Sequence, residues 1–146
     1  MLKSEKSAAE ESTVQKMYTI QELMTVNTVL LKCKNDKEVK KSSTILSGIR
    51  ISRKIQQLIK EFYEERDEIF KTFEIPKKIN DKGQEYYDFT DHAEKSKIEQ
   101  SLKEAAETKY EVKGFNEIDA DDFVFYTRGL DNDEVVFLYG YLVKEE

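Results

Sequence analysis

The sequence predicts a mainly α-helical fold with minor β structure: an antiparallel pair of helices, one of them long, backed by a third helix and by a C-terminal helix or hairpin. Apolar residues recur at helical spacing in several stretches of the chain. Three of these stretches begin with the spacing of a capping box, in which an N-cap oxygen and a glutamate three residues later satisfy two backbone N–H groups. The longest stretch would not be stable without partners along its length, so a packed neighbour is expected.

The first helix is expected at residues 19–34. Thr19 and Glu22 have capping-box spacing, and Tyr18 and Leu23 have the spacing of a hydrophobic staple. The residues expected on its buried face recur at helical spacing and comprise Ile20, Leu23, Met24, Asn27, Leu30 and Leu31.

A second, longer helix is expected at residues 43–73, with Ser42 or Ser43 as its N-cap. At 1.5 Å per residue it would be a rod of about 45 Å. Its charge order opposes the helix dipole at both ends, which favours an antiparallel neighbour. Gly48 costs about 1 kcal/mol inside a helix, so a kink or a later start is expected near it. Ser52 and Arg66 interrupt an apolar stripe that comprises Ile45, Ile49, Ile55, Leu58, Ile59, Phe62, Ile69 and Phe73.

Pro76 is expected to end the second helix. A turn follows at residues 80–83, and the aromatic residues after it favour either a short hairpin or an ordered loop. A third helix is expected at residues 91–109, because Asp91 and Glu94 have capping-box spacing. Its narrow apolar stripe comprises Ile98, Leu102, Ala105 and Ala106.

The C-terminal part is expected to begin with extended segments at residues 110–115 and 123–126, joined by a turn or a single helical turn. Residues 131–143 form either a helix or a strand that pairs with the preceding segment as a hairpin. The helix is favoured, because Asp131 and Glu134 have capping-box spacing and the apolar residues after them fit helical spacing.

The length of 146 residues fits one domain. We expect residues 1–17 to form a flexible polar tail and residues 18–146 to form a single helical domain. A single cysteine excludes an internal disulfide, no apolar run is long enough to span a membrane, and the polar N-terminus is unlike a secretory signal. These features predict a cytoplasmic protein.

The residue types of common catalytic and metal sites are scarce. The single histidine, His92, is expected on a helix surface, and Cys33 is expected to be a packed, unreactive thiol. The acidic clusters at residues 119–122 and 131–134 are better explained as caps and solvated turns than as a Mg²⁺ or Ca²⁺ site. No glycine pattern of a phosphate loop and no nucleophile elbow is present. The sequence therefore predicts no catalytic residue, no metal and no cofactor.

Charge is divided unevenly along the chain. Residues 1–60 carry twelve basic and six acidic side chains, whereas residues 61–146 carry twelve basic and twenty-four acidic ones. In the basic half, Arg50, Arg53 and Lys54 form a candidate patch for nucleic-acid phosphates, unless they face the acidic half of the chain itself. The whole basic stretch comprises Lys32, Lys34, Lys37, Lys40, Lys41, Arg50, Arg53 and Lys54.

Aromatic residues are dense near the C-terminus, and most of them must belong to the core. If the last segment is a helix, its apolar residues lie nearly all round it, so one side is a candidate protein interface formed by Phe137, Tyr139 and Tyr141. The aromatic residues of this region are Phe115, Phe123, Phe125, Tyr126, Phe137, Tyr139 and Tyr141.

The segment 18–24, Tyr-Thr-Ile-Gln-Glu-Leu-Met, is followed by a long helix that contains Ile-Ser-Arg-Lys-Ile at 51–55 and Glu-Glu-Arg at 64–66. A glycine turn, a shorter helix and an acidic, hydrophobic last segment complete this layout over roughly residues 18–143. The layout resembles a group of small, uncharacterised proteins encoded by tailed phages and prophages of Gram-positive bacteria. The chain departs from them in its Tyr- and Phe-rich end and its long polar N-terminus. The resemblance implies an intracellular accessory protein and supplies no site residues.

Together these features favour a non-enzymatic phage or prophage protein of the host cell cytoplasm. It would act by protein–protein interaction or self-association, as an adaptor, an inhibitor or an assembly factor. The alternative is a nucleic-acid-associated accessory protein that uses the basic patch. A third hypothesis is an inhibitor whose acidic half mimics nucleic acid.

Overall fold

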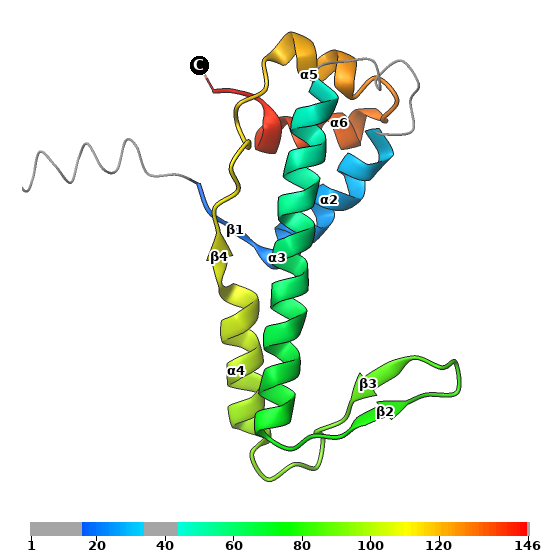
Figure 1. Ribbon diagram of the computed structural model, residues 1–146, viewed down its shortest axis with the longest axis vertical. Helices are drawn as coiled ribbons and strands as arrows, with labels where there is room; N and C mark the ends of the chain where they lie inside the picture. Colours follow the sequence, from blue (N-terminus) through cyan, green and yellow to red (C-terminus); the bar gives the residue numbers. More distant parts are fainter. Residues whose placement is uncertain (1–15, 34–43, 146) are drawn as a thin grey trace, which may run out of the picture.

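A computed structural model describes residues 16–33 and 44–145 and confirms the mainly α-helical fold with minor β structure. The long helix α3 is the axis of the molecule, with α2, α5 and α6 around its N-terminal half and α4 beside its C-terminal half (Figure 1). Of the flexible tail predicted for residues 1–17, only Lys16 and Met17 lie within the described residues. In chain order the elements are β1 (Tyr18–Thr19), α2 (Ile20–Cys33), α3 (Thr44–Thr72), β2 (Lys77–Ile79), β3 (Glu85–Tyr87), α4 (Lys95–Glu107), β4 (Lys109–Tyr110), α5 (Ala120–Tyr126) and α6 (Asn132–Leu142).

Two hydrophobic clusters lie along α3. The larger cluster joins α2, the N-terminal half of α3, α5 and α6, and Tyr126 and Leu138 are completely buried in it. The smaller cluster lies between the C-terminal end of α3 and α4, where Phe70 and Ile98 are buried. Because both clusters use α3, the long helix has partners along its length, as its stability requires.

Helix α2 begins with the predicted capping box. The Thr19 N–H donates to Oε1 of Glu22 at 3.2 Å, and the Glu22 N–H donates to Oγ1 of Thr19 at 3.3 Å. The predicted buried face was partly wrong: Leu31 is 42% exposed, whereas Val26 and Val29 are buried. The buried sector of α2 is wider than one stripe, because the helix contacts both α3 and α6.

Helix α3 begins at Thr44 and is continuous through Gly48, so the predicted late start is wrong. Ser42 and Ser43, the predicted N-caps, lie outside the described residues. Ser52 does not interrupt the buried face; it is fully buried, and its hydroxyl donates to Oδ1 of Asn27 on α2 at 2.8 Å. Ile51 is also buried, whereas Ile45 and Ile49 are only partly covered. The predicted stripe was therefore partly right, because Ile55 and Leu58 are buried, but the true buried face also includes Gly48, Ile51 and Ser52.

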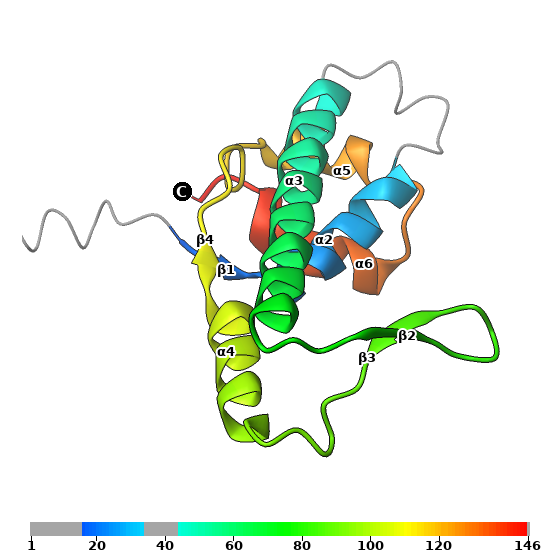
Figure 2. The same cartoon turned by 60° about the horizontal axis from the view of Figure 1, so that its bottom comes forward.

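The turn at residues 80–83 closes a hairpin, which decides between the two predicted alternatives. Lys77 pairs with Tyr87 and Ile79 with Glu85 in an antiparallel register. The hairpin projects away from the helices (Figure 2). Asn80 Oδ1 stabilises the turn, because it accepts hydrogen bonds from the N–H groups of residues 82 and 84 at 2.9 Å each.

Helix α4 begins at Lys95, and the capping box predicted at Asp91 is not formed. Glu94 is the N-cap residue without a side-chain bond, and its own N–H donates to Nδ1 of His92 at 3.0 Å. The buried stripe is narrower than predicted, because Ile98 and Ala105 are buried but Ala106 is exposed.

The extended segment predicted at residues 123–126 is wrong, because these residues belong to α5. The last segment is the favoured helix, α6, and both bonds of the Asp131–Glu134 capping box are present. Of the extended segment predicted at residues 110–115, strand β4 at Lys109–Tyr110 includes only the start; it pairs with β1. The following connection hydrogen-bonds to the end of α6, where the Ile118 N–H donates to the Leu142 carbonyl at 3.0 Å.

Candidate functional site

The three aromatic residues predicted as an interface do not share one surface. The Tyr141 ring lies 5.5 Å from the Tyr18 ring and 5.1 Å from the Phe137 ring, and its hydroxyl donates to Oε2 of Glu22 at 3.2 Å. Phe137 and Tyr141 are half-buried and pack against the larger hydrophobic cluster. Burial, followed by the Glu22 carboxylate, raises the pKa of the Tyr141 hydroxyl. These two rings therefore hold α6 against α2.

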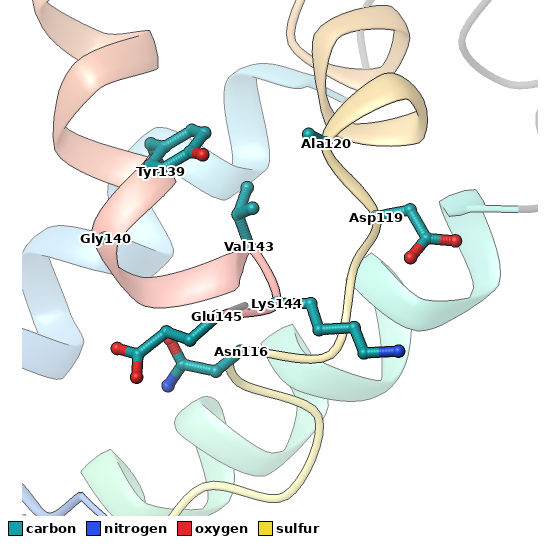
Figure 3. A pocket seen from close by; sticks show the side chains of 8 residues that line it. All are labelled: Asn116, Asp119, Ala120, Tyr139, Gly140, Val143, Lys144 and Glu145. Carbon is teal, nitrogen blue, oxygen red and sulfur yellow. The ribbon is translucent and has the colours of Figure 1, made fainter.

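Tyr139 lies on a different side of α6. It is 50% exposed, and its ring meets the Phe123 ring of α5 edge-on with centroids 5.6 Å apart. Figure 3 shows Tyr139, Val143 and Ala120 around a hollow between the two helices. This hollow has a volume of about 780 Å³, and residues from α5, α6 and the chain end line it.

Further exposed apolar residues lie one helical turn from this hollow on each of the two helices. Val124 lies one turn after Ala120 on α5, and Val136 lies one turn before Gly140 on α6. Val124 is 66% exposed and Val136 is 74% exposed. A Cβ atom added at Gly140 would meet nothing within 4 Å. We call the surface formed by Ala120, Val124, Val136, Tyr139 and Gly140 the α5–α6 face.

Acidic residues are frequent in the segment that carries the α5–α6 face. Residues 115–145 contain eight acidic and two basic side chains. The acidic ones gather at the first turns of α5 and α6, where they are stabilised by the positive end of each helix dipole. Lys144 and Glu145 close one end of the hollow, and Glu145 pairs with Lys16. The exposed apolar groups of the face thus lie beside charged residues, among them Asp119, Lys144 and Glu145 at the hollow.

Only two of the three residues of the candidate nucleic-acid patch line the same hollow. Arg50, Arg53 and Lys54 are all exposed on α3. Arg50 and Lys54 line a second hollow of about 520 Å³ together with Lys113, whereas Arg53 does not line it. Lys113 was not singled out from the sequence, because sixty residues separate it from Arg53 and only the folded connection after β4 brings it near α3. Lys34, Lys37, Lys40 and Lys41 lie outside the described residues.

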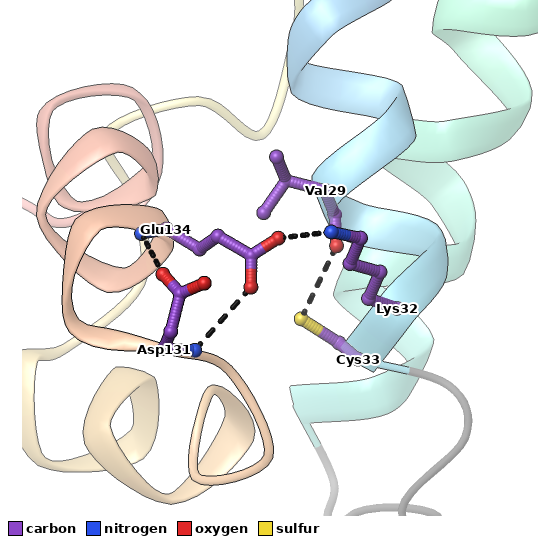
Figure 4. Close-up of polar contacts among 5 residues, drawn as sticks. All are labelled: Val29, Lys32, Cys33, Asp131 and Glu134. Atoms are coloured by element: carbon purple, nitrogen blue, oxygen red, sulfur yellow. Dashed lines mark hydrogen bonds and ion pairs between the residues drawn. The ribbon is translucent and has the colours of Figure 1, made fainter.

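Lys32, also part of the predicted basic stretch, pairs with Glu134 of the α6 capping box (Figure 4). It therefore belongs to the contact between α2 and α6. Cys33, the next residue, is buried as expected, with its Sγ atom 3.9 Å from the Val29 carbonyl oxygen. Burial raises the pKa of its thiol to about 12, so the thiol is protonated and a poor nucleophile at neutral pH.

His92 lies before α4, is half-buried and contacts the backbone through both ring nitrogens, whereas the sequence predicted a position on a helix surface. Its Nε2 atom lies 3.0 Å from the Phe73 carbonyl oxygen, and its Nδ1 atom accepts the Glu94 N–H. Within residues 16–33 and 44–145, no group of three histidine, cysteine or acidic side chains is arranged to hold a metal ion. In that same part of the chain, no helix is both long and apolar enough to cross a membrane.

Comparison with models of protein families, with curated proteins and with solved structures finds no match to this chain. The candidate sites therefore depend on the geometry alone.

Proposed function

We propose that this chain is a non-enzymatic accessory protein of a phage or prophage that binds another protein, as an adaptor, an inhibitor or an assembly factor in the host cytoplasm. The observation that supports this function is the α5–α6 face. Large exposed apolar side chains framed by polar ones are typical of protein-binding surfaces.

Two features of this face are poorly explained by the stability of the chain itself. Val136 gains little from folding because it is 74% exposed. Gly140 costs about 1 kcal/mol inside a helix relative to alanine, although no contact within the described residues requires a glycine there. A glycine that keeps a hollow open and a valine that faces outward both suit an approaching partner chain.

The test is capture of partners from nuclease-treated lysate of a Gram-positive host, analysed by mass spectrometry, with sedimentation to detect self-association. The test variant is Val136→Asp with Tyr139→Ala, both on the α5–α6 face. We expect it to lose a stoichiometric protein partner, or the oligomer, while circular dichroism stays helical. Tyr141 is left unchanged, because its ring and hydroxyl hold α6 to α2.

Ile79→Asp is the matched control, because Ile79 is similarly exposed, at 68%, but lies on the β2–β3 hairpin. It should bind like the wild-type chain. Equal binding by the wild-type chain and the α5–α6 variant would contradict the proposal, as would equal loss in the hairpin control.

A second candidate function is association with nucleic acid. It is supported by Arg50, Arg53 and Lys54, which are exposed on one half of α3 and form no ion pair with another described residue. Binding of this kind should weaken steeply with salt, because counterions are released when cations meet phosphates. Absence of binding to single- and double-stranded DNA and to RNA at low salt would dismiss this function.

A further inference from the structure

We infer that the hollow between α3 and residues 113–118 binds a phosphomonoester: a terminal phosphate group on a small organic body, such as a nucleotide. The inference is independent of the α5–α6 face. It rests in part on the second candidate function, because it assigns two of its three cations to a defined pocket.

Three cationic residues from two parts of the chain line the hollow. Arg50 and Lys54 lie one turn apart on α3, and Lys113 comes from the connection after β4. None of the three pairs with a carboxylate of another described residue. Like charges brought together without partners repel one another, and an anion between them removes this repulsion. Their convergence therefore favours an anionic ligand.

The packed backbone fixes the wall that carries Lys113. Gly114 has a φ of +103°, which side chains rarely allow, and a Cβ atom there would lie 3.0 Å from Cγ1 of Ile51. At Gly114 the connection therefore packs closely against α3, and Figure 1 shows it running beside this helix. Ile51 and Ile118 are buried beneath the hollow and give it an apolar floor. A volume of about 520 Å³ lies within the usual range of about 300–1,000 Å³ for small-molecule pockets.

The charge of the lining fits a monoester better than a diester. The three cations and the single carboxylate of Glu117 give the lining a net charge of +2. A phosphomonoester carries about −1.5 to −2 at neutral pH, whereas each diester of a nucleic-acid backbone carries one negative charge. The Arg50 guanidinium can bind two phosphate oxygens at once, while the lysines act as point charges. Ser47 adds a hydroxyl donor at the edge.

The phosphate position within the hollow is set by the neighbouring acidic residues. A smaller hollow, lined by Asp119 and Asp122, adjoins this one and shares Ser47, Glu117 and Ile118 with it. Repulsion from these carboxylates places the phosphate at the end formed by Arg50, Lys54 and Lys113. The organic body of the ligand then lies over Ile51 and Ile118, within reach of Glu117 for a hydrogen bond from a hydroxyl or amino group.

Isothermal titration of the full chain tests the inference with thymidine 5′-monophosphate, adenosine 5′-monophosphate, unphosphorylated thymidine, and short oligothymidines with and without a 5′-phosphate. We expect the monophosphates to bind and thymidine not to bind. Each lysine would make a charge-assisted hydrogen bond to the phosphate. Lys54→Gln and Lys113→Gln should therefore each raise the dissociation constant about tenfold. Arg53→Gln is the matched control, since it removes the same charge from the same helix outside the hollow.

The outcomes separate this inference from the second candidate function. Binding of free monophosphates identifies a nucleotide ligand, and binding only of the 5′-phosphorylated strand identifies a strand end; both support the pocket. Equal binding of both strands, weakened as much by Arg53→Gln as by Lys113→Gln, would overturn the pocket and leave general nucleic-acid association standing. No binding of any phosphorylated probe by the wild-type chain would overturn both.

Discussion

At the scale of single residues, the contact between Gly48 and Tyr126 sets how closely α5 approaches α3. A Cβ atom at Gly48 would lie 1.9 Å from the Tyr126 hydroxyl oxygen and 2.7 Å from its Cζ atom. Tyr126 is completely buried, so its ring cannot move aside without disturbing the larger cluster. This glycine is therefore a packing requirement and not a flexible point in the helix.

Replacing Gly48 with alanine is expected to destabilise the protein by about 1–3 kcal/mol, because the added methyl group overpacks the core. Helix propensity alone predicts the opposite sign, a gain of about 1 kcal/mol. Gly140→Ala is the matched control, since it is also helical but has open space around its Cβ position; it should stabilise slightly. Urea denaturation measures both, and a shift of the same sign in the two variants would contradict the packing argument.

Cys33 gives a prediction for alkaline pH. Burial raises the pKa of its thiol from 9.0 to about 12, so the unfolded chain loses this proton at lower pH than the folded chain does. The protonated thiol therefore contributes fully to the free energy of unfolding below about pH 9. This free energy should fall as pH rises from about 9 towards about 12. Denaturation of the wild type and Cys33→Ala across this range measures the difference, and the variant should show the shallower decline. Parallel curves would mean that the thiol is not protected.

At the scale of secondary-structure elements, local signals were predictable and long-range ones were not. The capping boxes at Thr19 and Asp131 could be predicted because the two partners of each box lie three residues apart in the sequence. The same spacing at Asp91 fails because His92 accepts the Glu94 N–H and also meets the Phe73 carbonyl of the preceding helix. Residues 123–126 have strand-favouring side chains, yet they are helical, because that arrangement buries Phe123 and Tyr126 in the larger cluster.

The two Asp-x-x-Glu sites give a matched pair of variants. Asp131→Ala removes an acceptor of the Glu134 N–H at 2.9 Å and should cost about 0.5–2 kcal/mol. Asp91→Ala changes a site with the same Asp-x-x-Glu spacing but removes no cap, so it should leave the free energy of unfolding nearly unchanged. Chemical denaturation of the two variants measures the difference. A loss as large for Asp91→Ala as for Asp131→Ala would show that local spacing, and not the observed bond, decides stability.

At the scale of the whole molecule, the candidate sites depend on distant contacts that no local pattern records. Helical spacing alone places Arg50 and Lys54 on one edge of α3, but Lys113 joins them only because Gly114 allows the connection to lie against Ile51. In α6 the apolar residues lie nearly all round the helix, so no stripe indicates which of them face outward. Helical spacing does separate Tyr139 from Phe137 and Tyr141, because residues two apart on a helix point to nearly opposite sides. Which of these sides packs against α2 depends on where that helix lies, and spacing could not predict it.

The two hydrophobic clusters on α3 predict that the molecule opens in two stages. The smaller cluster, around Phe70, holds α4 and the β2–β3 hairpin to one end of the long helix, while α2, α5 and α6 pack around the other. Phe70→Ala leaves a cavity and should cost about 3–5 kcal/mol at that end. Amide hydrogen exchange by mass spectrometry should then speed up in the hairpin, α4 and the last turns of α3, while α2 and α6 stay protected.

Leu138→Ala, a truncation in the larger cluster, should instead speed exchange throughout, because α2, α5 and α6 share that cluster and the rest of the molecule is too small to fold without it. Uniform acceleration in Phe70→Ala would show that α3 transmits the loss along its length and that the chain unfolds as one cooperative unit.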